Sequence, residues 1–213
     1  MLLIFDWDGT LSDSTERITL AMQRAADEVG LGPLSAERVR NIIGLGLPEA
    51  LLKLYPDTDD LARGQLRDAY RHHFSLLDHQ PSALFPGVLE TLEHLGNQGH
   101  RLAIATSKSR QGLDRILAGL GLGDLFEASR CADETASKPH PLMLQQLLTQ
   151  FHVGVDEAVM VGDTEYDMEM ARCIQMPRIA VSYGAHAIER LKPYEPIMCV
   201  DDFVQLLQWD ALS

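Results

Sequence analysis

The chain has 213 residues, of which 46% are hydrophobic and 23% are charged, so it can bury a good core and has room for one domain plus a sizeable insertion. Its formal net charge of -13 argues against nucleic acid or an acidic membrane surface as partner, because binding either needs a basic face. No apolar run approaches the ~18 residues of a membrane span and no signal peptide precedes the first strand, so we expect a cytoplasmic protein. Cys131, Cys173 and Cys199 lie far apart, and free buried thiols are expected.

The first stretch, Leu2 to Thr10, combines an apolar strand with two carboxylates. Residues 2–5 are all apolar, which is typical of a strand buried on both faces of a parallel sheet. Asp6 and Asp8 follow at the carboxyl end, where ligands bind in open α/β sheets. Two carboxylates this close need a cation to stay ionised, and hard oxygen ligands select magnesium or calcium, of which magnesium is expected. The alternative is an ordinary strand-to-turn boundary.

Residues 14–82 show helical patterns without an intervening strand. Asp13 or Ser14 is expected to cap the first helix, which Gly30 to Pro33 ends. Further helices are expected at residues 35–43, 47–54 and 59–79. This segment is therefore read as an all-helical insertion after the first strand.

Strands and helices alternate in the remainder of the chain. Such alternation predicts right-handed crossovers and a parallel, Rossmann-like sheet of the α/β class, with the first strand central beside the fourth. Strands are expected at residues 101–105, 126–129, 158–161, 178–181 and 197–200. Helices are expected at residues 88–95 (ended by Gly96), 110–120, 139–151 and 203–209, and residues 162–167 open one more.

Four short motifs stand at strand ends or helix starts: Asp6 to Thr10, Thr106-Ser107, Lys138-Pro139, and Gly162-Asp163 with Asp167. In this order they resemble the four motifs of the haloacid dehalogenase superfamily. The helical insertion is similar to the C1 cap of the phosphoglycolate phosphatase-like branch. The resemblance implies an α/β core formed by residues 1–13 and 83–213 and a helical cap domain formed by residues 14–82.

The resemblance also implies a role for each motif residue. Asp6 would be the nucleophile, and Asp8 the acid that protonates the leaving alcohol and then the base that activates water. Lys138 would neutralise Asp6 and the phosphate. Mg²⁺ would be held by Asp6, the backbone carbonyl of Asp8 and Asp163, with Asp167 orienting a bound water or Lys138. Thr106, through its hydroxyl, and Ser107, through its amide, would bind the phosphoryl oxygens.

Several other residues are given structural roles. His72, His73, His79 and His140 are not expected to bind metal, because neighbouring helix positions do not face one ion. Lys108 lies near the phosphate motif but is expected to be an exposed lysine. Trp7 is expected to pack in the core.

The predicted activity is magnesium-dependent hydrolysis of a small phosphorylated metabolite through an aspartyl phosphate, by a monomer or weak homodimer. Two alternatives remain open at this point: a sugar-phosphate mutase of the β-phosphoglucomutase type, and a non-catalytic binding protein on the same fold. The cap loop 41–48 contains no lysine or arginine, which argues against holding a second phosphate. Arg38, Arg40 and Lys53 lie close in sequence and could compensate.

Overall fold

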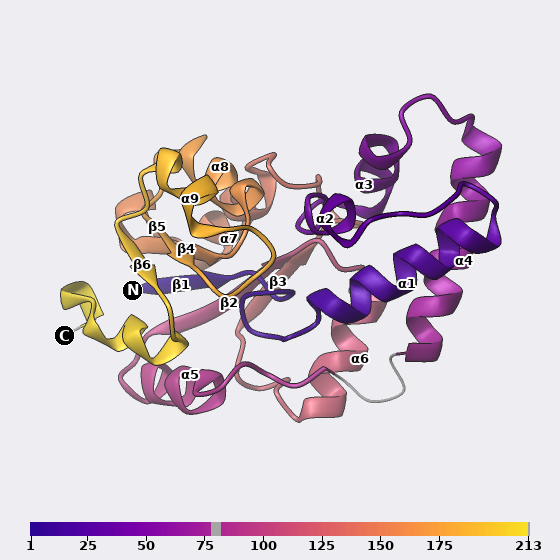
Figure 1. The fold of residues 1–213 in the computed structure, drawn as a ribbon. Helices are drawn as coiled ribbons and strands as arrows, with labels where there is room; N and C mark the ends of the chain where they lie inside the picture. The colour runs from indigo at the N-terminus through magenta and orange to yellow at the C-terminus, as the bar shows by residue number, and fades with distance from the viewer. Residues whose placement is uncertain (78–81, 213) are drawn as a thin grey trace.

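A six-stranded parallel sheet forms the centre of the molecule, in the order β3-β2-β1-β4-β5-β6. The computed structural model describes residues 1–77 and 82–212 (Figure 1). The predicted central place of β1, between β2 and β4, is confirmed, and all strand pairs are parallel. The strands are β1 (Leu2–Phe5), β2 (Arg101–Thr106), β3 (Ala128–Cys131), β4 (Ala158–Gly162), β5 (Arg178–Val181) and β6 (Met198–Val200).

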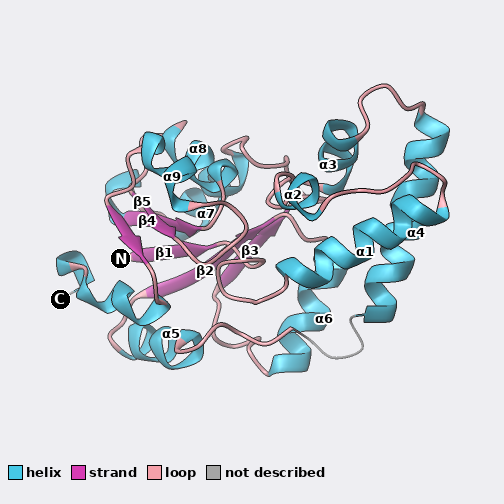
Figure 2. Cartoon of the chain, viewed as in Figure 1, coloured by secondary structure: helices cyan, strands magenta, loops and turns pink. Residues whose placement is uncertain are grey.

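Helices cover both faces of the sheet, which makes β1 fully buried (Figure 2). Leu3 and Phe5 point to the face covered by α5 and α6, whereas Leu2 and Ile4 point to the face covered by α7 and α8. This alternation explains why every residue of the strand is apolar. The helices are α5 (Val88–Asn97), α6 (Arg110–Leu120), α7 (Leu142–Phe151), α8 (Glu165–Arg172) and the unpredicted α9 (Ile188–Leu191), with 3-10 helices at Val155–Glu157, Lys192–Tyr194, Phe203–Gln208 and Asp210–Leu212.

Some predicted boundaries were wrong for identifiable reasons. The third strand begins two residues late, because Phe126 packs edge-to-face against the buried Trp7 instead of joining the ladder. Helix α5 continues through Gly96, and Gly99, with a φ of +84°, follows its end. Helix α7 starts at Leu142 because Pro141 disfavours helical backbone at the residue before it.

The final predicted helix is instead the 3-10 helix Phe203–Gln208. The cysteines also differ from expectation: Cys131 is buried, whereas Cys173 and Cys199 are exposed, Cys199 on the edge strand β6. All three are free. No helix among the described residues is long and apolar enough to cross a membrane.

Of the five helices between β1 and β2 in the described chain, the first four pack on one another beyond the carboxyl ends of the strands (Figure 1). Their apolar sides share one core, in which Met22, Val39, Leu51 and Leu66 are almost fully buried. The predicted run 59–79 extends past the described residues, and His79 lies outside them. These helices are α1 (Thr15–Glu28), α2 (Ala36–Arg40), α3 (Leu47–Leu54) and α4 (Asp60–Leu77).

Two glycines give opposite predictions for stability. A Cβ at Gly162 would lie 2.4 Å from Asp167 Cβ, so Gly162→Ala should lower the free energy of unfolding by roughly 1–3 kcal/mol through overpacking. A Cβ at Gly64, inside α4, would meet nothing within 4 Å, so Gly64→Ala should raise it by about 0.5–1 kcal/mol. Urea unfolding of both variants measures the difference. A Gly162→Ala protein as stable as wild type would show that the strand and helix do not approach this closely.

Candidate active site

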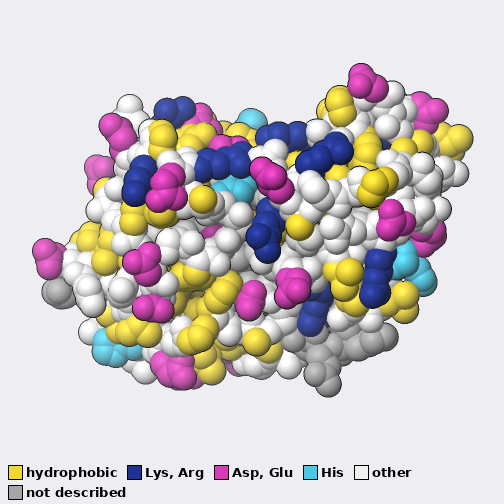
Figure 3. All heavy atoms as spheres, viewed as in Figure 1, with side chains coloured by type: hydrophobic (Ala, Val, Ile, Leu, Met, Phe, Trp, Pro, Cys, Tyr) yellow, Lys and Arg dark blue, Asp and Glu magenta, His cyan; other side chains and the backbone are white. Residues whose placement is uncertain are grey.

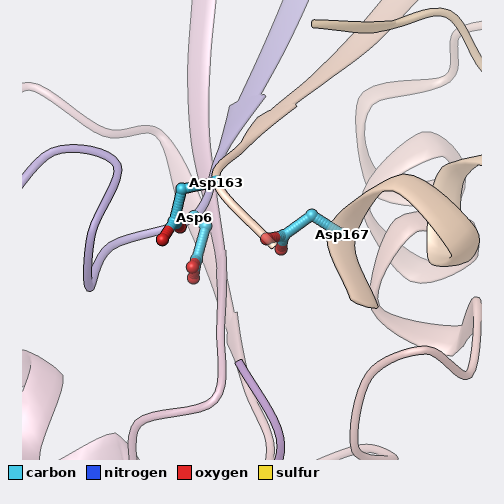
Figure 4. A group of neighbouring side chains, drawn as sticks. All are labelled: Asp6, Asp163 and Asp167. Carbon is cyan, nitrogen blue, oxygen red and sulfur yellow. The ribbon is translucent and has the colours of Figure 1, made fainter. Parts of the chain in front are cut away.

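The ends of β1 and β4 place two aspartates side by side (Figure 4). The Asp6 amide donates to the Val161 carbonyl at 3.0 Å, which continues the ladder one residue past β1. Gly9, in the following turn, has a φ of +86°, and a Cβ there would lie 2.2 Å from Asp163 Oδ2. A glycine is therefore required for the loop after β1 to approach Asp163.

A third aspartate comes from the first turn of α8. Asp167 Oδ2 accepts hydrogen bonds from the Thr164 amide at 3.0 Å and the Thr164 hydroxyl at 2.7 Å, which completes the capping box of this helix. Its side chain points toward Asp6 and Asp163 (Figure 4). One oxygen from each of these three buried carboxylates lies within 4.8 Å of the other two.

Lys138 is the cation that joins this cluster. Its ammonium lies 2.6 Å from Asp6 Oδ1 and 2.7 Å from Asp167 Oδ1, and its side chain is fully buried. Burial acts to lower the pKa of Lys138, but the charges of Asp167 and Asp6 outweigh it and raise that pKa above its ordinary value. Lys138 therefore remains charged, and it contacts the carboxylates of both Asp6 and Asp167.

One ammonium does not balance three carboxylates, which leaves two negative charges when all are ionised. Burial raises the pKa of Asp6 well above its ordinary value, and the charge of Lys138 offsets this only in part. Burial and then the charge of Asp167 raise the pKa of Asp163 to about 7. A buried set of hard oxygen ligands with excess negative charge fits a divalent cation. Among residues 1–77 and 82–212 it is the one group of three or more His, Cys, Asp or Glu side chains close enough to share a metal ion.

Asp8 lies outside this cluster and is held by two side chains. Its Oδ1 accepts a hydrogen bond from the Ser14 hydroxyl at 2.5 Å and lies 3.0 Å from the Lys108 ammonium. Ser14 occupies the predicted N-cap position of α1, but its side chain makes no capping hydrogen bond because it binds Asp8. The prediction that Lys108 is an exposed lysine was wrong: only 9% of its side chain is exposed, because it pairs with Asp8.

Thr106 is the last residue of β2 and Ser107 follows it, next to the end of β1. The Thr106 side chain is buried and its hydroxyl accepts from the Lys108 amide at 3.2 Å. The Ser107 hydroxyl donates to the Gly44 carbonyl in the loop between α2 and α3 at 2.5 Å. The Ser107 side chain therefore binds the helical insertion. The motif pattern does not predict this contact.

The insertion is docked on the sheet domain by further hydrogen bonds. The Gly46 amide donates to the Ser137 hydroxyl at 2.7 Å. Tyr166, on α8, donates its hydroxyl to the Asn41 carbonyl at 2.7 Å and accepts from Lys53 at 2.7 Å. In the sequence, Ser137 directly precedes Lys138 and Tyr166 directly precedes Asp167. This proximity to motif residues is the sequence signal that points to Ser137 and Tyr166.

Arg190 adds an electrostatic contact to the same boundary. It forms an ion pair with Glu165 and donates to Asn41 Oδ1 at 2.6 Å. In Figure 3 several Lys and Arg side chains lie over this region, between α9 and α2, although the chain is strongly acidic overall. Nothing in the sequence around α9 predicted its involvement, because its position depends on the fold.

Comparison with known proteins places these motifs in a family. The model of the haloacid dehalogenase-like hydrolase family matches residues 3–181. The probable phosphatase IndB of Dickeya dadantii is 36% identical over 213 residues, covering 97% of this chain and 91% of that protein. A phosphoglycolate phosphatase of Vibrio vulnificus is 30% identical over 214 residues, covering 97% and 94%. The crystal structure of a hydrolase from Pseudomonas syringae matches with a TM-score of 0.90 at 25% identity, covering 100% of this chain and 99% of that one.

The family model spans most of the chain, and both relatives align over nearly its whole length. The predicted resemblance is thereby confirmed, as is the α/β fold of the core. The chain belongs to the haloacid dehalogenase-like hydrolase family.

Proposed function

We propose that this chain is a Mg²⁺-dependent phosphomonoesterase that hydrolyses a small phosphorylated metabolite through an aspartyl phosphate on Asp6. The observation that carries the proposal is the buried Lys138 ammonium between Asp6 and Asp167, beside Asp163. An ionised carboxylate at this point can attack phosphorus only if nearby positive charge offsets the repulsion of the incoming dianion. The relatives named phosphatase and phosphoglycolate phosphatase support the same reaction class.

The positions of the side chains support a role for each motif residue. Asp6 attacks the phosphoryl group and Lys138 offsets its charge. Asp8 donates a proton to the leaving oxygen and later takes one from the attacking water. The Thr106 hydroxyl and the Ser107 amide bind phosphoryl oxygens.

Asp6, Asp163 and the Asp8 carbonyl would hold Mg²⁺, and Asp167 supports the site by fixing Lys138. When bound, the ion supplies positive charge to the transferring phosphoryl group. The Thr10 hydroxyl and the Ala185 amide fix the Asp163 carboxylate, at 2.9 and 2.7 Å. Such contacts orient a metal ligand before the ion arrives.

We also propose that residues 14–82 are a cap domain on a core formed by residues 1–13 and 83–213. The hydrogen bonds of Gly44 and Gly46 to Ser107 and Ser137 support this division, because each of these serines adjoins a proposed phosphate-binding residue. A cap held in this way excludes water from the reacting groups.

Hydrolysis is favoured over a mutase reaction by the contacts of two of the three cations near the loop 41–48. Lys53 donates to the Tyr166 hydroxyl, and Arg38 donates to the Leu54 carbonyl at 2.6 Å within the cap. Both are therefore committed to structural contacts. Discharge of the phosphoenzyme to water needs no second phosphate site.

The first experiment tests the activity itself. Phosphate release from a panel of small phosphomonoesters with Mg²⁺ should fall roughly a thousandfold or more in Asp6→Asn, because the amide is isosteric but is not a nucleophile. Excess chelator should also silence the enzyme, and added Mg²⁺ should restore it. Activity of Asp6→Asn within tenfold of wild type would remove Asp6 as the nucleophile.

The second prediction concerns the pH dependence of metal binding. Burial and the charge of Asp167 raise the pKa of Asp163 to about 7 in the folded, metal-free protein, whereas the ordinary pKa of an aspartate is 3.8. The protein's stability should therefore fall as pH rises between about 4 and 7, because the folded state binds more protons than the unfolded chain. Mg²⁺ should raise the melting temperature more at pH 8 than at pH 5.5, where protons compete for the carboxylate. Equal shifts at both pH values, or an undiminished shift in Asp163→Asn, would contradict this.

The third prediction isolates Asp8. Asp8→Asn should slow the hydrolysis of alkyl phosphates more than that of p-nitrophenyl phosphate, whose leaving phenolate needs little protonation. Steady-state kinetics with both ester types give the comparison. Equal losses on both would argue that Asp8 is not the acid.

A further inference from the structure

Lys108 is a second lysine that contacts an aspartate of the candidate active site. The proposed reaction assigns it no role. Its ammonium lies 3.0 Å from Asp8 Oδ1, and only 9% of its side chain is exposed. On its other side lies the ring of Phe74, on cap helix α4, whose centroid is 5.2 Å from Nζ. The ammonium is thus held between the core and the cap.

The two oxygens of Asp8 are used differently. Oδ1 receives both Ser14 and Lys108, whereas Oδ2 has no hydrogen-bond partner among residues 1–77 and 82–212. Oδ2 is therefore the oxygen available to carry the proton for the leaving group. By ordinary hydrogen-bond lengths, the leaving oxygen then lies on the order of 6 Å from the Lys108 ammonium. A substituent on the carbon that bears this oxygen reaches Lys108.

Charge balance indicates which substituent fits. Asp8 is the one carboxylate in the described parts of the chain that forms an ion pair with Lys108. A nearly buried ammonium is costly unless groups that accept its hydrogen bonds or carry the opposite charge surround it. The ammonium also has three N–H donors, of which Asp8 uses one. An anionic group on the leaving alcohol would pair with this ammonium and accept from its remaining N–H donors.

We propose that Lys108 is the specificity-determining residue for the leaving group, and that it binds an anionic substituent, such as a carboxylate, next to the ester oxygen. The ring of Phe74, on cap helix α4, contacts the ammonium from the other side and helps to fix its position. This inference rests on the proposed phosphomonoesterase activity and adds to it the residue that selects among esters.

A pair of isosteric esters tests the assignment: 2-phosphoglycolate and its neutral amide. Wild-type kcat/KM should favour the acid by about 10- to 100-fold, the range of a charge-assisted hydrogen bond. Lys108→Met should bring this ratio close to one, mainly by raising KM for the acid. Lys53→Met is the matched control, because it removes a lysine at the cap boundary that contacts Tyr166 and not Asp8, and its ratio should equal that of wild type.

The outcomes separate the two proposals. If neither ester nor any aryl phosphate is hydrolysed by wild type, the proposed function fails. If both esters are hydrolysed and Lys108→Met loses activity on them equally, or the wild-type ratio is already near one, the function stands and the role of Lys108 is overturned. Circular dichroism establishes that the variants fold, and Lys108→Gln replaces Lys108→Met if the latter does not.

Discussion

The ion pairs of the buried Lys138 ammonium with Asp6 and Asp167 hold the candidate active site together. Without the lysine, three carboxylates within 4.8 Å would face one another in a buried site, and protonation would relieve the repulsion. Removing one member of a buried ion pair typically costs roughly 3–5 kcal/mol, since the remaining charge stays unpaired. The lysine therefore stabilises the site, and in the proposed mechanism it keeps Asp6 competent as a nucleophile.

The backbone is built to permit this concentration of charge. Gly9 and Gly162 lie so close to Asp163 and Asp167 that a Cβ at either position would collide with the neighbouring carboxylate side chain. Parallel pairing of β1 with β4 then fixes which carboxylates meet. The four motifs are separated by long stretches of sequence. They meet because they follow the carboxyl ends of parallel strands in the same sheet.

Contacts with the helical insertion extend the site beyond that edge. Ser107 and Ser137 bind the main chain of the loop between α2 and α3, and each directly adjoins a proposed phosphate-binding residue. A movement of this loop would therefore displace residues that directly adjoin the proposed phosphate-binding residues. Lys108 makes a similar link through the ring of Phe74.

The sequence predicted those features that depend on local pattern. Four apolar residues followed by Asp6 and Asp8 indicated the central strand and its polar end, and both are found there. The exposure of Lys108 was mispredicted because its partner, Asp8, is one hundred residues away in the chain. For the same reason, the contacts of Arg190 with Asn41 and of Tyr166 with Lys53 were not foreseen. Side-chain contacts between distant segments depend on how the fold brings these segments together. The local hydrophobic pattern of a single sequence does not reveal such contacts.

The most direct test of the account is to trap the phosphorylated enzyme. In Asp8→Asn, p-nitrophenyl phosphate should still phosphorylate the protein, because its leaving group needs little protonation, whereas hydrolysis of the acyl phosphate should be slow without the base. Rapid quenching with substrate labelled at phosphorus, followed by peptide mapping, should place a hydroxylamine-labile label on Asp6, and the label should be absent when Lys138 is also replaced by Met. A label on any other residue, or an unchanged amount of label without Lys138, would contradict the central claim that this lysine maintains Asp6 as the nucleophile.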